Sequence, residues 1–214
     1  MFRFTLRETV LIGVMGGVWG FLELTLGMVL HNFRVPYRGI LLASLGFFVM
    51  LTLKRLVPRF GSILLAGLIA VAIKLLAANA MIANIMLAIY LEAIGWEFIC
   101  HFLRKRSLLL TIFGGIYTGF VCSSFFIIGM MLFSGMKWEQ VYKMYRSQAE
   151  FFTSYMPQGM DPVVVYLIFE SMLALVFVSI AVRSSDRLIK RFTRFSGVPL
   201  TKCSPETEHD INIL

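Results

Sequence analysis

Five charged side chains lie inside long apolar stretches of this 214-residue chain. They are four glutamates and one lysine: Glu23, Lys74, Glu92, Glu97 and Glu170. A charged side chain at the centre of a bilayer costs about 3 kcal/mol on insertion scales, so five without partners would cost roughly 15 kcal/mol. We therefore expect these side chains to face a bundle interior or a wet cavity and to find partners there.

Tryptophans accompany two of these acids at helical spacing. Trp19 and Glu23 are four residues apart, as are Glu92 and Trp96, so each pair shares one face of a helix. An acid beside an aromatic ring suits a cationic or planar heteroaromatic ligand. The structural alternative is that Lys74 forms an ion pair with Glu92 or Glu23 while the tryptophans only pack. Because one lysine cannot neutralise four glutamates, we favour a ligand site.

Depth along the expected helices places Glu23, Lys74, Glu92 and Glu170 in the outer half or the middle of the bilayer, and Glu97 toward the cytoplasm. At 1.5 Å per residue, Glu23 lies about 10 Å below the outer end of its helix. Asn79 falls at the outer rim and Asn84 near the outer end of the next helix. We predict an outward-facing pocket whose ligand-binding residues are Trp19, Glu23, Lys74, Asn79, Asn84, Glu92, Trp96 and Glu170.

The elements that position these residues must be membrane-spanning helices. The chain is 58% apolar and 15% charged, with a mean hydropathy of +0.81, whereas soluble domains are about half apolar and a quarter charged. A hydrocarbon core about 30 Å thick requires roughly 20 mostly apolar helical residues. We predict an all-α polytopic membrane protein with six transmembrane helices at about 9–30, 39–53, 62–78, 81–102, 108–133 and 161–182.

The lysines and arginines predict the orientation of these spans. With a cytoplasmic N-terminus, fourteen of the 20 lie in cytoplasmic segments: Arg3, Arg7, Lys54, Arg55, Arg59, Arg104, Lys105, Arg106, Arg183, Arg187, Lys190, Arg191, Arg194 and Lys202. Five lie in outer segments: Arg34, Arg38, Lys137, Lys143 and Arg146. Because cytoplasmic loops carry the excess of Lys and Arg, we expect an N-in/C-in protein of the plasma or inner cell membrane. The net charge of +8 is then an orientation signal, and nucleic acid is not an expected partner.

Several classes of chemistry find no support in the sequence. Cys100, Cys122 and Cys203 are too few and too scattered for a disulfide framework or a zinc site. The three histidines lie apart from the buried acids, and the chain has no Walker loop, HExxH or GxSxG motif. We therefore expect a protein without catalytic residues, cofactor or bound metal.

Two outer segments and one tail do not span. Residues 134–160 carry Trp138, Val141, Tyr142 and Tyr145 on one helical face, which indicates either an interfacial amphipathic helix or a lid over the pocket. The loop 31–38 is a second candidate gate. Residues 1–195 form the expected transmembrane domain, with the first apolar run retained as a span, and residues 196–214 form a flexible cytosolic tail.

Overlapping small-residue patterns lie on the first span. Gly13 and Gly17 are four residues apart, as are Gly16 and Gly20. Faces with this spacing allow helices to approach closely in lipid. The partner is either a neighbouring helix of the same chain or another membrane subunit.

A small six-helix membrane protein with this topology and no ATPase motif resembles the substrate-binding S-components of energy-coupling-factor vitamin transporters. The glycine face of the first helix takes the place of an alanine-rich face that the family docks on its coupling subunit. The loop residues Arg34, Pro36, Tyr37 and Arg38 correspond to the family's gating loop, and residues 67–74 are similar to its small-residue third helix. The resemblance covers most of the chain at the level of architecture.

This resemblance implies a membrane subunit that binds a small vitamin-like nutrient from outside. A transmembrane coupling subunit and cytosolic ATPases would drive its release. The buried acids favour a cationic or zwitterionic molecule. Two alternatives stay open: a self-contained proton- or cation-coupled carrier, and a non-catalytic assembly subunit of a membrane complex.

Overall fold

The computed structural model describes residues 4–33, 37–76, 82–103, 106–133, 135–153 and 161–196. Within them the backbone is helical, with no strand, which confirms the predicted all-α class. The helices are α1 (Leu6–Asn32), α2 (Arg38–Leu56), α3 (Ser62–Leu75), α4 (Ile82–Leu103), α5 (Ser107–Phe133), α6 (Trp138–Thr153) and α7 (Pro162–Ser196).

Four of the described helices are long and apolar enough to cross a membrane. They are α1, α2, residues Met86–Leu103 of α4 and residues Val163–Arg191 of α7. Two further apolar stretches, Ser62–Leu75 and Ser107–Val121, are shorter. Because these helices also leave many large apolar side chains exposed, the molecule is a membrane-embedded helical protein.

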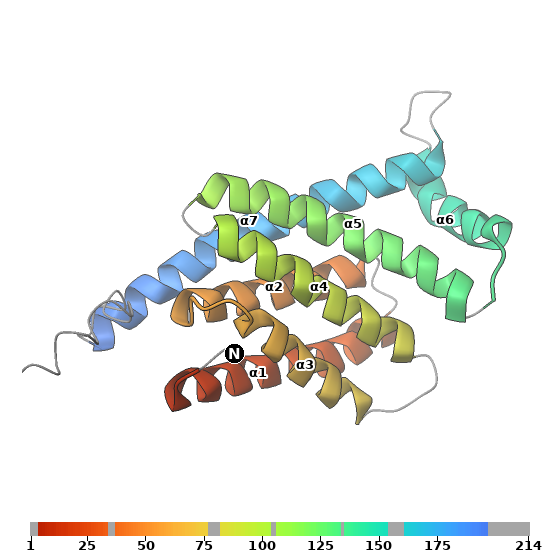
Figure 1. The fold of residues 1–214 in the computed structure, drawn as a ribbon. Helices are drawn as coiled ribbons and strands as arrows, with labels where there is room; N and C mark the ends of the chain where they lie inside the picture. The colour runs from red at the N-terminus through yellow and green to blue at the C-terminus, as the bar shows by residue number, and fades with distance from the viewer. Residues whose placement is uncertain are drawn as a thin grey trace, which may run out of the picture.

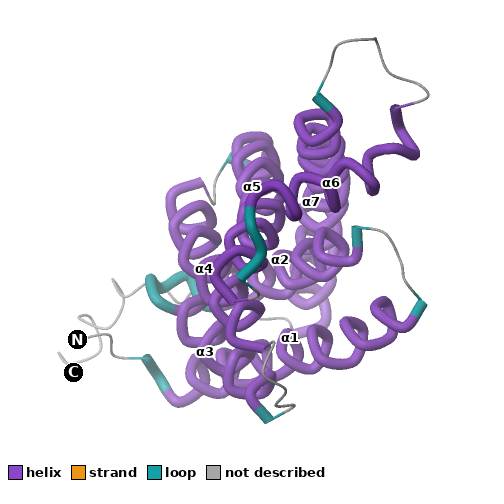
Figure 2. Tube along the Cα trace, turned by 90° about the vertical axis from the view of Figure 1, so that its right-hand side faces the viewer, coloured by secondary structure: helices purple, strands orange, loops and turns teal. Residues whose placement is uncertain are grey.

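Six helices form a closed ring, with α6 at one end. The main contacts run from α1 to α3, then to α4, α5, α7 and α2, and back to α1 (Figures 1 and 2). Helices α1 and α3 run parallel to each other, as do α2 and α7, and the other neighbours in the ring are antiparallel. Helix α6 packs on α5 and α7 where α5 ends and α7 begins (Figure 1). We call this the α6 end of the bundle, and the other the opposite end.

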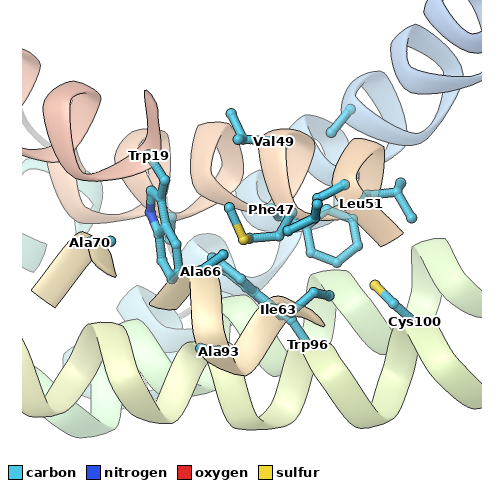
Figure 3. Packing of buried hydrophobic residues seen from close by; sticks show 14 of the residues in the cluster. Trp19, Phe47, Val49, Leu51, Ile63, Ala66, Ala70, Ala93, Trp96 and Cys100 are labelled. Carbon is cyan, nitrogen blue, oxygen red and sulfur yellow. The ribbon is translucent and has the colours of Figure 1, made fainter. Parts of the chain in front are cut away.

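Helix α2 leans into the ring and contacts five of its neighbours, and it is the most buried of the four candidate spans. Figure 3 shows Trp19 of α1, Phe47 of α2 and Trp96 of α4 meeting beside Ala66 of α3. The centre of the ring is therefore a packed core rather than an open channel.

Small residues bring α1 and α3 together. A Cβ added at Gly16 would lie 2.8 Å from the carbonyl oxygen of Ala66, and one at Gly20 would lie 3.0 Å from the Cα of Ala70. The spacing of these glycines thus serves a contact within the chain, one of the two partners expected from the sequence.

The last helix is longer than the predicted span. Helix α7 continues from the expected end near position 182 to Ser196. No glycine or proline interrupts the sequence until Gly197 and Pro199, so the apolar stretch ends while the helical backbone does not. Helix α3 ends earlier than expected, at Leu75 rather than residue 78.

Candidate functional site

An ion pair links α1 and α3 towards the α6 end. Lys74 Nζ lies 2.8 Å from Glu23 Oε2, and both side chains are largely buried. The lysine lies one helical turn beyond Ala70, and the glutamate one turn beyond Trp19. Of the two pairings that the sequence allowed for Lys74, the structure contains the one with Glu23.

Two tryptophans lie directly beneath this pair. The rings of Trp19 and Trp96 are 5.4 Å apart, and both side chains are fully buried (Figure 3). Trp96 Nε1 donates to the Thr118 hydroxyl over 3.2 Å. Trp19 Nε1 has no acceptor among the described residues, although an unsatisfied buried donor costs about 1–3 kcal/mol. This N–H packs against Gly46 of α2, where an added Cβ would lie 2.5 Å from Nε1, so it is an unsatisfied donor at the α1–α2 contact.

Glu92 lies at the same level of the bundle as the Glu23–Lys74 pair. Helices α1 and α4 run in opposite directions, so Glu23, four residues after Trp19, and Glu92, four residues before Trp96, both lie one turn nearer the α6 end than the tryptophan contact. Glu92 is 6% exposed. We call Glu23, Lys74 and Glu92 the polar layer, and Trp19 and Trp96 its floor.

Glu92 also interacts electrostatically with Tyr117 of α5. The Tyr117 hydroxyl donates to the carbonyl oxygen of Leu91 over 2.7 Å. The polar layer therefore involves side chains from α1, α3 and α4 and is bordered by a tyrosine from α5.

A second ion pair lies near the opposite end, where the sequence led us to expect a surface lysine. Lys54 of α2 is 0% exposed and pairs with Glu97 of α4, which is also 0% exposed. Lys54 Nζ also donates to the Arg59 carbonyl over 2.8 Å. The buried set thus contains at least two lysines, not one, and Glu97 belongs to a structural contact apart from the polar layer.

Glu97 also completes the start of α3. The N-cap of that helix is Gly61, whose positive φ of 91° forms the turn. Because glycine has no side chain, it cannot accept a hydrogen bond from the first amides of α3. Glu97 Oε2 accepts a hydrogen bond from the Ile63 amide over 2.8 Å. A glycine at the N-cap position leaves the first amides of a helix without a local side-chain acceptor. Gly61 was therefore the sequence signal that a residue distant in sequence must accept a hydrogen bond from the start of α3.

Glu170 lies beside a tyrosine held in an unusual backbone conformation. Tyr37, the N-cap of α2, has φ 58° and ψ 22°, a left-handed conformation that is uncommon for bulky residues. Its ring stacks on Tyr166 at 5.5 Å and contacts Phe169 at 5.3 Å. Burial, and then the charge of Glu170, raise the pKa of Tyr37 to about 12. One predicted gate residue therefore packs on α7 above a predicted site glutamate.

Helix α6 covers the start of α7. Val141 is fully buried against Val163 and Tyr166, with Tyr37 and Tyr142 packed around them. On its exposed side an open surface hollow of about 380 Å³ is lined by Trp138, Glu139, Tyr142, Lys143 and Arg146. The helix thus has a packed side and a side with charged and aromatic groups, which is compatible with both interpretations of segment 134–160.

Some of the remaining predicted site residues lie within the described part of the chain, and others do not. Arg34, Pro36 and Asn79 lie outside the described residues, and Asn84 lies in the first turn of α4 with its side chain likewise undescribed. Arg38 hydrogen-bonds His31. Gly13 and Gly17 have open space where a Cβ would lie. Within the described ranges no group of three or more His, Cys, Asp and Glu side chains could hold a metal ion.

No protein-family model matches the chain, and neither a curated protein nor a solved structure does.

Proposed function

We propose that this chain is the substrate-binding membrane subunit of a transporter that takes up a small cationic or zwitterionic nutrient. In this proposal the six ring helices span the membrane, both termini are cytoplasmic and the α6 end faces outside. The orientation rests on the excess of Lys and Arg that the sequence assigns to the opposite side. The chain itself performs binding and conformational change, without covalent catalysis.

The polar layer above its tryptophan floor carries this proposal. Glu23 and Glu92 bring two carboxylates, and Lys74 one ammonium group, to one level of the bundle. A carboxylate excess at a buried position favours a ligand with positive charge. The paired indole rings of Trp19 and Trp96 supply an aromatic surface for the ring of the same ligand. A zwitterionic or cationic heterocycle fits this combination better than a simple anion.

The proposed gate lies between this layer and the outside. Tyr37 packs over Glu170 and beneath α6, while Arg34, Pro36 and Arg38 complete the loop in sequence. Strained backbone conformations are found where a segment changes state during function. We propose that the described arrangement is the closed gate, with α6 as part of the lid.

The proposed partner surface is the outer face of α1. Gly13 and Gly17 have open space at their Cα atoms, and the exposed side chains Val10 and Val14 accompany them. Since Gly16 and Gly20 are used against α3, the neighbouring small face is the one left for a transmembrane coupling subunit. Cytosolic ATPases would act through that subunit.

Ligand binding is tested by a thermal-shift screen of the purified chain. The panel contains cationic, zwitterionic, neutral and anionic heterocyclic vitamins, each at saturating concentration. Binding at 100 times the dissociation constant contributes about 2.7 kcal/mol, so a true ligand should raise Tm by about 5 °C or more. We expect the positive compounds to be cationic or zwitterionic. Unchanged Tm with every compound would contradict the proposal.

A self-contained cation-coupled carrier remains the second candidate, because Glu92 and Glu170 are buried carboxylates within helices. The two candidates differ in what the chain does alone. In proteoliposomes holding only this chain, the subunit proposal expects binding without accumulation of the compound. Accumulation driven by a proton or sodium gradient would establish the carrier instead.

A further inference from the structure

One exposed face of α7 changes from apolar to cationic along the helix. The residues on this face follow one another at intervals of three or four, which keeps them on a single stripe. Its first part is Phe169, Met172, Val176 and Ile180. Its second part, which we call the arginine stripe, is Arg183, Arg187, Arg191 and Arg194, all exposed.

Contacts with α2 fix the direction of this stripe. Ala181, Val182 and Ser185 of α7 are buried. The Thr52 hydroxyl lies 3.1 Å from the Ser185 hydroxyl in a buried hydrogen bond. Since the opposite side of the helix is held against the bundle, the arginine stripe points away from it.

The change of character indicates where the helix leaves the hydrocarbon. Helix α7 has 35 residues, which corresponds to about 52 Å at 1.5 Å per residue, well beyond a hydrocarbon core of about 30 Å. Figure 1 shows its C-terminal part running past the ends of its neighbours. Exposed Met172, Val176 and Ile180 suit acyl chains, so the boundary falls between Ile180 and Arg183.

We propose that the arginine stripe binds the phosphates of anionic phospholipids in the adjoining leaflet. Guanidinium groups bind phosphate oxygens through two parallel hydrogen bonds. A lipid is favoured over an acidic protein because the stripe directly continues the face that contacts acyl chains, so one lipid molecule can meet Ile180 with its chains and Arg183 or Arg187 with its headgroup. Interaction with the helix dipole accounts for cations only in the last turn, near Arg194. The inference is independent of the proposed ligand site.

The test measures which lipids the full chain retains in detergent. Purified protein is titrated with phosphatidylglycerol or phosphatidylcholine of identical acyl chains, and bound lipid is counted by native mass spectrometry. The variant Arg183→Gln/Arg187→Gln/Arg191→Gln removes three charges from the stripe. The matched control, Lys137→Gln/Lys143→Gln/Arg146→Gln, removes three charges at the α6 end. The single variant Arg187→Gln serves if the triple variant does not fold.

We expect the wild-type protein to bind phosphatidylglycerol at least tenfold more tightly than phosphatidylcholine. A basic residue near an anionic surface contributes about fivefold in affinity, so Arg187→Gln should weaken phosphatidylglycerol binding by two- to fivefold and the triple variant by at least tenfold. The control should keep the wild-type preference. Equal binding of the two lipids, an unchanged preference in the stripe variants or an equal loss in the control would overturn the proposal. So would tighter binding of inorganic phosphate or polyglutamate than of phosphatidylglycerol at equal ionic strength.

Discussion

Lys54 and Glu97 form a buried ion pair that also supports the start of α3. Their charges are enclosed completely, and the same carboxylate accepts a hydrogen bond from the first turn of α3. Breaking such a pair leaves an uncompensated buried charge, whereas replacing both partners restores much of the stability. The pair therefore links the α2–α3 turn to α4.

We predict that Lys54→Met lowers the free energy of unfolding by about 3–5 kcal/mol. Glu97→Gln should cost less than this, because a glutamine can still accept from the Ile63 amide. The double variant should be more stable than the sum of the two single effects implies. Unfolding by SDS in mixed micelles measures all three, and strictly additive losses would contradict the buried ion pair.

Tyr37 allows a prediction about pH. Its pKa in the folded protein is about 12 against a usual value of 10, so the neutral phenol favours the folded state. The stabilisation by the neutral phenol is therefore complete below about pH 10 and is lost as the pH rises to 12. Tyr37→Phe should therefore lose less stability than the wild type between pH 9 and 12. Comparing the unfolding curves of the wild type and Tyr37→Phe isolates the effect of this tyrosine from that of the others. If the free energies of unfolding of the two proteins change with pH in parallel, the raised pKa of Tyr37 is refuted.

At the residue scale, the sequence predicted that Glu23, Lys74, Glu92, Glu97 and Glu170 have buried surroundings. It also gave the Glu23–Lys74 pair as one alternative. It could not predict the Trp19–Trp96 contact, because helical spacing relates residues on one helix and not residues on two. Lys54 was missed since a lysine followed by an arginine at the end of an apolar run is typical of a membrane boundary.

At the element scale, four of the five glycines of α1 divide into two pairs with different surroundings. A Cβ added at Gly16 or Gly20 would lie 2.8–3.0 Å from backbone atoms of α3, whereas one at Gly13 or Gly17 would meet open space. The sequence predicted the small-residue face but not this division, since both pairs have the same spacing.

This division predicts opposite effects for matched alanine variants. Gly16→Ala/Gly20→Ala should destabilise the protein by about 1–3 kcal/mol, because α3 must move to admit the new methyl groups. Gly13→Ala/Gly17→Ala should leave stability unchanged or raise it by up to about 1 kcal/mol, since alanine favours the helix. Unfolding in mixed micelles distinguishes them, and equal losses would contradict the described α1–α3 contact.

The helix boundaries agree with the sequence-based prediction where the end of an apolar stretch coincides with a helix-breaking residue. Pro58 and Gly61 separate α2 from α3 as expected. The end of α7 differs because hydropathy reports where a helix leaves lipid, whereas proline and glycine report where the backbone stops being helical. In α7 these two points are about 14 residues apart, and the arginine stripe lies between them.

At the scale of the whole molecule, composition was sufficient to predict a membrane-embedded helical protein. The ring order was not predictable, since the spans are hydrophobic on all sides and their periodicity does not indicate which faces pack. The structure adds a filled centre with the polar layer towards one end. That arrangement is the physical basis for our proposal of a ligand site reached from the α6 end.

In the proposed function, Glu92 belongs to a site for a positively charged small molecule above the tryptophan floor. The most direct test is the dissociation constant, by equilibrium dialysis, of the compound that gives the largest thermal shift. Glu92→Gln is compared with wild type and with Asp186→Asn, a change at a half-exposed aspartate near the opposite end of the bundle. Because a buried charged contact contributes about 1.5–3 kcal/mol, we predict at least tenfold weaker binding for Glu92→Gln and a change within about twofold for Asp186→Asn. Binding by Glu92→Gln as tight as wild type would contradict the account.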